Sequence, residues 1–184
     1  RMFFTVTRDG KPLRKRRYWF SETFYIMANA EYYMATKETG YLETARNYFD
    51  FVYGMYKDPA TDPYKITPKS YSGTRDIKTL ANPMILLNVA SIMREADTER
   101  FQYYDDIITS LIADIRCFYK PEYHAMFENI SAADNSVILN SATCRVINPG
   151  HDIECSWFLL EEAVKRKDEE MIGFAKEVFD NAFA

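Results

Sequence analysis

One histidine in the sequence is placed for proton transfer. His151 follows the turn Asn148-Pro149-Gly150 and opens a helical pattern. Histidine is the side chain best suited to general acid/base work near neutral pH. We therefore expect His151 to be an acid/base residue at the mouth of a pocket. The alternative is a helix N-terminus that holds an incidental histidine.

Two more side chains follow His151 on the same predicted helix. Glu154 comes three residues later and Trp157 three after that, and we expect all three to share one face. A carboxylate beside an imidazole sets its tautomer and raises its pKa, whereas the positive end of the helix dipole lowers that pKa. Trp157 would offer a flat surface to a sugar ring.

The elements that must position these residues are mostly helical. Apolar residues recur at helical spacing in six stretches. The helices are predicted over residues 21–37, 41–56, 77–95, 99–119, 151–166 and from 168 to the end. Ser21, Asp76 and Asp168 are the expected caps, and Gly40 is expected to end the first helix. Pro83 lies early in the third predicted helix, which can start later or kink there.

The remaining stretches predict short strands and long loops. Residues 3–13 alternate around Asp9-Gly10, which indicates a β-hairpin. Residues 59–75 hold three prolines and predict a loop, and residues 120–150 predict a second excursion with strands at 125–128 and 144–147.

Tight turns and long loops alternate along the chain, so the helices are predicted to form hairpins in series. Such a series is a repeat architecture, in which each pair buries its apolar face against its neighbours. We expect an all-α toroid of helix pairs, with the long loops 59–76 and 120–150 at one mouth and the functional site there.

Composition sets limits on the partners. The 184 residues are 47% hydrophobic and 16% aromatic, with a net charge of −4. An aromatic content of this size suits either a carbohydrate pocket or an aromatic core. Acidic and basic residues are interspersed apart from the cluster 14–17, so we expect no nucleic-acid partner.

The cysteines and the hydropathy suggest a compartment. Cys117, Cys144 and Cys155 are odd in number and lack the spacing of metal ligands. They indicate free thiols in a reducing compartment, so we expect a cytoplasmic protein without a metal. Neither a signal peptide nor a membrane-spanning run is apparent, and no membrane partner is expected. The chain opens on Arg1 and closes on a helical pattern, which is typical of an internal segment.

Three stretches of the chain resemble one enzyme family. Residues 148–161 read Asn-Pro-Gly-His-Asp-Ile-Glu-Cys-Ser-Trp-Phe-Leu-Leu-Glu, residues 21–25 read Ser-Glu-Thr-Phe-Tyr, and residues 78–84 read Lys-Thr-Leu-Ala-Asn-Pro-Met. Glu128-Asn129 also fits. Together these blocks resemble the N-acylglucosamine 2-epimerase and cellobiose 2-epimerase superfamily, in the expected order.

The resemblance implies a fold and a reaction. The family fold is an (α/α)6 barrel, of which residues 1–184 would be an incomplete single-domain segment with about six helices. Family enzymes remove the C2 proton of an open-chain sugar and reprotonate the opposite face of the enediolate, here interconverting N-acetylglucosamine and N-acetylmannosamine or a related aldose. His151 matches one of the two family histidines, and Glu154 matches its carboxylate neighbour. The second histidine and a substrate-binding arginine fall outside the chain.

The resemblance also assigns substrate contacts. Phe20, Glu22, Asn82 and Met84 would line the barrel mouth with Trp157, although packing and helix capping are equally open roles for the first four. His124 fits no family motif and is expected to be a surface loop residue. No cofactor is required. Some relatives respond to ATP through a glycine-rich loop, and only Gly73 and Arg75 match that pattern here.

Other functions remain open at this point. An aldose–ketose isomerase of the same superfamily would share the enediolate. A glycoside hydrolase would need two carboxylates across the scissile bond, where this sequence offers a histidine. A non-catalytic helical scaffold that binds a protein would leave the Asn-Pro-Gly-His motif without a purpose. ATP as an allosteric effector and a homodimer also stay open.

Overall fold

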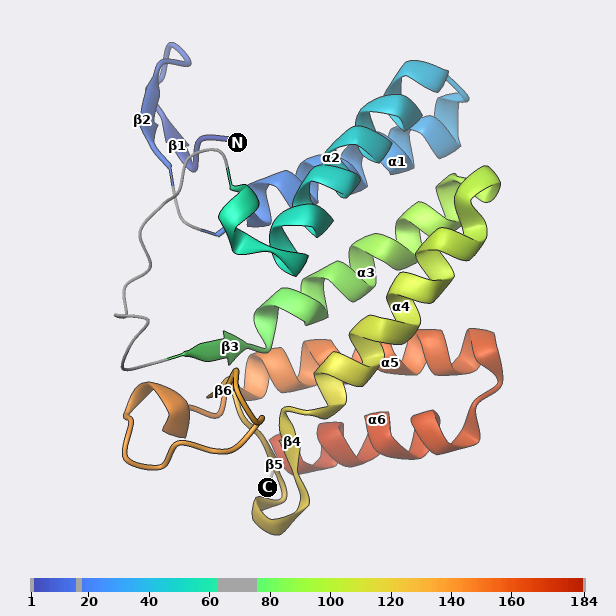
Figure 1. The fold of residues 1–184 in the computed structure, drawn as a ribbon. Coiled ribbons are helices and arrows are strands. Elements are labelled where there is room, and N and C mark those ends of the chain that lie inside the picture. The colour runs from blue at the N-terminus through green and yellow to red at the C-terminus, as the bar shows by residue number, and fades with distance from the viewer. Residues whose placement is uncertain (1, 16–17, 63–75, 184) are drawn as a thin grey trace. The chain divides into compact units, whose positions relative to one another are not determined.

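The computed structural model describes residues 2–15, 18–62 and 76–183. In these ranges it contains six α-helices, four 3-10 helices and six strands (Figure 1). None of these strands is longer than three residues. The prediction of an all-α fold with six helices and only short strands is confirmed, and it agrees with a segment of an (α/α)6 barrel.

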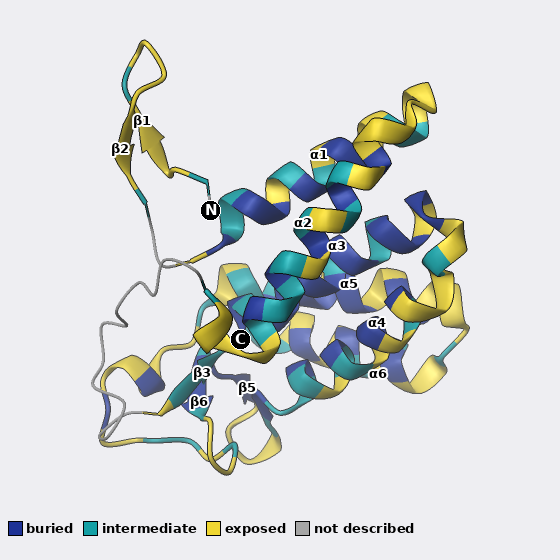
Figure 2. Cartoon of the chain, turned by 45° about the horizontal axis from the view of Figure 1, so that its top comes forward, coloured by how far each residue is buried: buried dark blue, intermediate teal, exposed yellow. Residues whose placement is uncertain are grey.

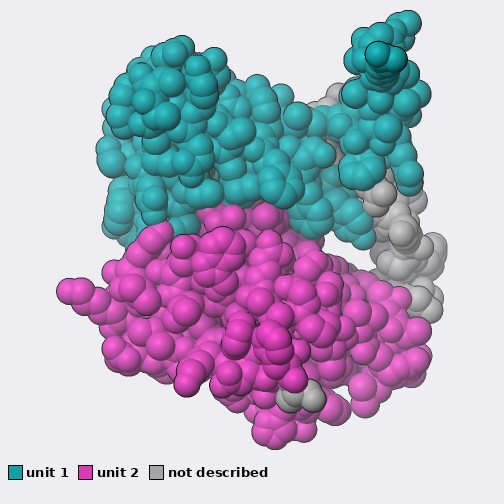
Figure 3. Space-filling model, turned by 180° about the vertical axis from the view of Figure 1, so that it is seen from behind, with its two compact units in different colours: residues 1–69, 89–105 teal, residues 70–88, 106–184 magenta. Residues whose placement is uncertain are grey.

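By its contacts the chain divides into two compact units. Unit 1 is Arg1–Lys69 with Val89–Asp105, and unit 2 is Ser70–Asn88 with Asp106–Ala184 (Figure 3). The helices α3 (Ala81–Ala96) and α4 (Phe101–Arg116) contribute residues to both units. The single barrel domain, and the placement of the loops at one mouth, stay predictions.

Unit 1 is built on a helix hairpin that follows a small β-hairpin. Strands β1 (Thr5–Val6) and β2 (Pro12–Arg14) pair antiparallel around Gly10, whose φ of 83° suits glycine. Helices α1 (Phe20–Thr36) and α2 (Thr39–Lys57) then pack together. The face that α2 buries has helical spacing: Leu42, Ala45, Phe49, Val52 and Met55 (Figure 2).

Two boundary predictions in unit 1 are wrong. Ser21 lies inside α1, and the N-cap is Trp19, whose side chain makes no capping bond. Gly40 lies in the first turn of α2 rather than at the end of α1. The chain instead turns at Lys37, which takes a left-handed φ of 63° and donates its N–H to the carbonyl of Tyr33.

An ion-pair network joins α2 to the turn between α3 and α4 in unit 1. Arg46 donates twice to Asp97, at 2.6 and 2.5 Å, and the Tyr104 hydroxyl donates to the same carboxylate at 3.0 Å. Asp97 is 1% exposed. Arg100 adds a bidentate pair with Asp50 at 2.8 and 2.9 Å. Because a buried carboxylate is costly without partners, these bonds hold the turn against α2.

Unit 2 combines the hairpin of α5 (Pro149–Arg166) and α6 (Glu169–Ala182) with four short strands. Strand β3 (Ile77–Thr79) pairs antiparallel with β6 (Asn129–Ser131), and β4 (Tyr119–Lys120) pairs with β5 (Ala125–Met126). Asp168 caps α6 as predicted, accepting from the Met171 N–H at 3.0 Å. The Tyr119 hydroxyl donates to Glu177 at 2.5 Å and so ties β4 to α6.

Two predictions in unit 2 are wrong as well. The third helix starts at Ala81 rather than at Ile77, because residues 77–79 form β3 and Pro83 falls in the first helical turn, where its missing N–H costs no hydrogen bond. Residues 144–147 are not a strand. Thr143–Arg145 form a 3-10 helix, and only Ile147 makes a β-bridge, with Phe127.

Candidate active site

The N-terminus of α5 positions His151. Asn148 is the N-cap, and its side-chain oxygen accepts from the backbone N–H of His151 at 3.4 Å. Pro149 occupies the first helical position, where its fixed φ is already helical. The predicted helix is confirmed, but Pro149 and Gly150, which were expected in a turn, are its first two residues, so the helix begins two residues before His151.

Replacing Asn148 with Ala is expected to lower the free energy of unfolding by about 1 kcal/mol, the usual value of a lost N-cap. Urea denaturation measures the change. Asp168→Ala removes the corresponding cap of α6 and serves as the control. The two variants should lose similar stability, but only Asn148→Ala should also shift the NMR titration of His151. If Asn148→Ala and Asp168→Ala shift the titration of His151 equally, Asn148 has no specific effect on His151.

The side chain that orients His151 is Glu128. The ring Nδ1–H of His151 donates to Glu128 Oε2 at 2.7 Å, with the two side chains 34% and 13% exposed. Glu128 is itself fixed by its backbone: its carbonyl accepts from Leu80 N–H, and its N–H donates to the Val146 carbonyl, each at 2.9 Å. The carboxylate is therefore held in place by two chain segments before it meets the imidazole.

This hydrogen bond decides the protonation of His151. The bond to Glu128 raises the pKa of His151 above its ordinary value, burial opposes the rise, and the charges of Glu128, Glu154 and Asp152 add to it. The helix dipole was expected to act in the opposite direction, and a partly buried terminus is worth up to about 2 kcal/mol. The pKa of His151 is raised, with the bond to Glu128 as the largest cause.

The arrangement fits general acid/base chemistry. A carboxylate on Nδ1 fixes the tautomer of the neutral ring, so Nε2 is the atom left to accept a proton. When Nε2 has taken a proton, the same carboxylate stabilises the imidazolium. His151 can therefore remove a proton from a weak carbon acid and return it.

Glu128→Gln is expected to lower the pKa of His151, because the charge-assisted bond becomes a neutral one. The raised pKa means that the pair contributes stability that is complete below the pKa of His151 in the unfolded chain and is lost as the pH rises through its folded pKa. The difference in the free energy of unfolding between the native chain and the variant should therefore be largest at low pH. An NMR titration of the ring measures the pKa, and an unchanged midpoint would contradict the role of Glu128.

Glu154 does not bond to His151 in this structure. It lies half-buried on α5 and contributes to the raised pKa of His151 through its charge alone. The orienting role that was expected of Glu154 belongs to Glu128, which the sequence marked only as part of a family resemblance. The catalytic role of Glu154 stays a prediction.

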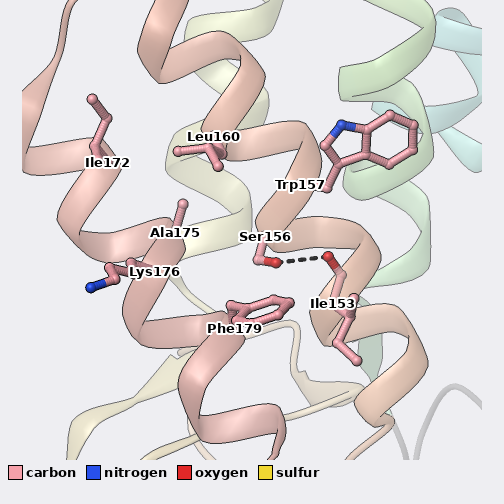
Figure 4. A pocket seen from close by; sticks show the side chains of 8 residues that line it. All are labelled: Ile153, Ser156, Trp157, Leu160, Ile172, Ala175, Lys176 and Phe179. Carbon is pink, nitrogen blue, oxygen red and sulfur yellow. Dashed lines mark hydrogen bonds between the residues drawn. The ribbon is translucent and has the colours of Figure 1, made fainter.

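Trp157 lies on another side of α5. It lines an apolar groove between α5 and α6 with Ile153, Leu160 and Phe179, and its side chain is exposed (Figure 4). Six helical positions separate it from His151, which places the two about 120° apart around the helix axis. The expectation of one shared face is wrong, and the contact of Trp157 with a sugar stays a prediction.

The expected substrate residues at the start of α1 belong to unit 1. Phe20 stacks on Tyr18 with ring centroids 5.6 Å apart, and both line a pocket with Phe4 and Phe24. Glu22 is 1% exposed and accepts from the backbone N–H of Met2 at 2.6 Å. Glu22 thus holds the chain before β1 against α1, which is the packing role left open by the sequence.

The other expected site residues fall at the start of α3 or outside the described ranges. Met84 is 4% exposed and packs in the core, and Asn82 is half-buried. Gly73 and Arg75, the expected nucleotide-loop residues, lie outside the described residues. His124 is exposed, as predicted. In the part of the chain that the structure describes, His, Cys, Asp and Glu side chains form no group that could hold a metal ion.

The helical hairpins and the Glu128–His151 pair define a class: all-α proteins that carry a carboxylate-oriented histidine at a helix N-terminus. Comparison with known protein families identifies one family within that class. The model of the family N-acylglucosamine 2-epimerase (GlcNAc 2-epimerase) matches residues 1–184, and the chain belongs to this family.

Individual relatives agree with the family. The chain is 31% identical over 168 residues to the N-acylglucosamine 2-epimerase of Homo sapiens, a match that covers 91% of this chain and 38% of the human protein. It is 24% identical over 194 residues to the cellobiose 2-epimerase of Dictyoglomus turgidum, covering 98% of this chain and 49% of that enzyme. The chain thus spans less than half the length of either relative. None of the helices in the described ranges has the length and apolar character needed to cross a membrane.

Proposed function

We propose that the protein carrying this chain is a sugar 2-epimerase in which His151 exchanges the C2 proton. The observation that carries the proposal is the 2.7 Å bond between His151 Nδ1 and Glu128 at the N-terminus of α5. It prepares Nε2 for proton transfer in a chain whose family is named for this reaction.

The chemistry follows from the substrate's own acidity. In the open-chain form, the aldehyde acidifies the proton at C2. Neutral His151 takes that proton on Nε2, the C2–H electron pair moves into the enediolate, and Glu128 stabilises the imidazolium that results. Return of a proton to the opposite face of C2 gives the epimer. That step needs a second group, which the family resemblance places outside this chain.

N-acylated hexosamines are the proposed substrates. The identity of 31% to an N-acylglucosamine 2-epimerase exceeds the 24% to a cellobiose 2-epimerase, so N-acetylglucosamine and N-acetylmannosamine are the first pair to test. No step of the proposed proton transfer calls for a redox cofactor or a metal, and residues 1–184 would supply one side of the site.

The decisive experiment incubates the protein with N-acetylmannosamine in deuterium oxide. We expect N-acetylglucosamine to accumulate with deuterium at C2, and NMR follows both the new anomeric signals and the loss of the C2 proton. A ketose product would identify an aldose–ketose isomerase instead. Absence of exchange from N-acylated and unmodified aldoses, including cellobiose, would favour the scaffold and overturn the proposal.

A further inference from the structure

A second acid lies directly beside the Glu128–His151 pair. Asp152 follows His151 in the first turn of α5 and is 3% exposed. It borders a cavity of about 270 Å³ that is also lined by Tyr119, His124 and Asn181. Asp152 therefore lies next to the pair and also borders this pocket.

The carboxyl group of Asp152 is poorly suited to carry a charge. Its Oδ1 is buried and has no hydrogen-bond partner among the described residues. An ionised carboxylate without partners is expensive to bury, whereas a protonated one costs much less. In line with this, burial raises the pKa of Asp152 to about 7, with the charge of Glu128 raising it further and that of His151 opposing the rise.

The charged surroundings of Asp152 come from several elements. On α5 they are His151 and Glu154, with the buried thiol of Cys155, whose pKa is raised by burial and by the charges of Asp152 and Glu154. Glu128 approaches from the segment before β6. The cavity side carries the titratable groups of Tyr119, Tyr123 and His124, and Glu177 acts there through its bond with Tyr119.

We propose that Asp152 is a positioning residue for His151: a buried acid, with an unpartnered Oδ1 in the first turn of α5, whose ionisation strengthens the imidazolium beside it. The charge of Asp152 favours protonated His151, and the charge of His151 favours ionised Asp152. Two groups coupled in this way titrate as a pair rather than singly. Asp152 therefore extends the pH range over which His151 keeps a proton.

This inference rests on the proposed function only for its catalytic consequence, namely a shifted pH profile of proton exchange. The ionisation itself is a property of the chain and needs no sugar. A failure to epimerise any sugar would overturn the proposed function and leave the coupled titration standing, so the two can fail separately.

The test is an NMR titration of the histidine ring protons. The chain contains only His124 and His151, so His124→Gln assigns the two signals. We expect the His151 signal of the native protein to titrate in two steps. In Asp152→Asn it should titrate in one step with a lower midpoint.

A matched control removes the same charge at an exposed position of the same unit. Asp180→Asn lies on α6 and should leave the His151 titration unchanged. If Asp152→Asn does not fold, the carboxyl carbon of Asp152 in the native protein is followed instead. It should titrate near neutrality. An Asp152 signal that titrates in the ordinary range of aspartate, or an unchanged His151 midpoint in Asp152→Asn, would overturn the proposal.

Discussion

His151→Ala is expected to remove exchange of the substrate C2 proton with solvent, lowering its rate by about 10²–10⁴-fold. The proton beside an aldehyde is only weakly acidic, so its removal near neutral pH requires a placed base. The proposed base is Nε2 of His151, whose Nδ1 is bonded to Glu128 at 2.7 Å. The measurement is loss of the C2 proton in deuterium oxide, in the protein that carries this chain.

Both epimers must be measured, because the proposed reaction uses two groups on opposite faces of C2. Loss of His151 can leave slow exchange from the epimer whose proton faces the second group. His124→Ala is the control, since His124 is exposed, whereas His151 is the histidine that is bonded to Glu128. If His151→Ala exchanges deuterium at the native rate from both epimers, His151 is not a catalytic base and the proposed function loses its support.

Asp97→Ala is expected to lower the free energy of unfolding by about 3–5 kcal/mol, the usual cost of breaking a buried ion pair from one side. The substitution leaves Arg46 without its bidentate partner and the buried hydroxyl of Tyr104 without an acceptor. Burial works to raise the pKa of Asp97, but the bonds from Arg46 and Tyr104 prevail and lower it. The native chain should therefore lose this stability as the pH falls through the folded pKa of Asp97.

Glu99→Gln is the matched control for Asp97. Glu99 accepts from the same Arg46 at 2.8 Å, but its side chain is 80% exposed. An exposed pair contributes about 0–1 kcal/mol, so the control should unfold at nearly the native urea concentration. If the two variants lost the same free energy of unfolding, the burial of Asp97 would not account for the stability that this ion-pair network contributes.

The local parts of the fold could be predicted from the sequence. The helices follow from apolar spacing such as Leu42, Ala45 and Phe49, and the cap of α6 follows from Asp168. The position of His151 in the first turn of α5 is equally local, because the N-cap Asn148 lies three residues before it.

The partner of His151 could not be predicted in the same way. Glu154 was favoured because it is close in sequence, whereas Glu128 is 23 residues away and arrives through pairing of short strands. Those strands are two or three residues long, too short to give a periodic signal. Tertiary pairing also explains β3, where three residues that continued a helical pattern were instead bonded to β6.

The backbone clamp on Glu128 has a consequence for the order of events during folding. Helices α1, α2, α5 and α6 form from contacts close in sequence, whereas Glu128 is held by segments that lie up to about fifty residues away, as in the Thr79–Asn129 bond with a separation of 50. Distant contacts form more slowly than local ones. A refolding chain should thus regain its circular dichroism first, while His151 still titrates like a histidine in a peptide. The bond between His151 and Glu128 is then expected to form after the helices.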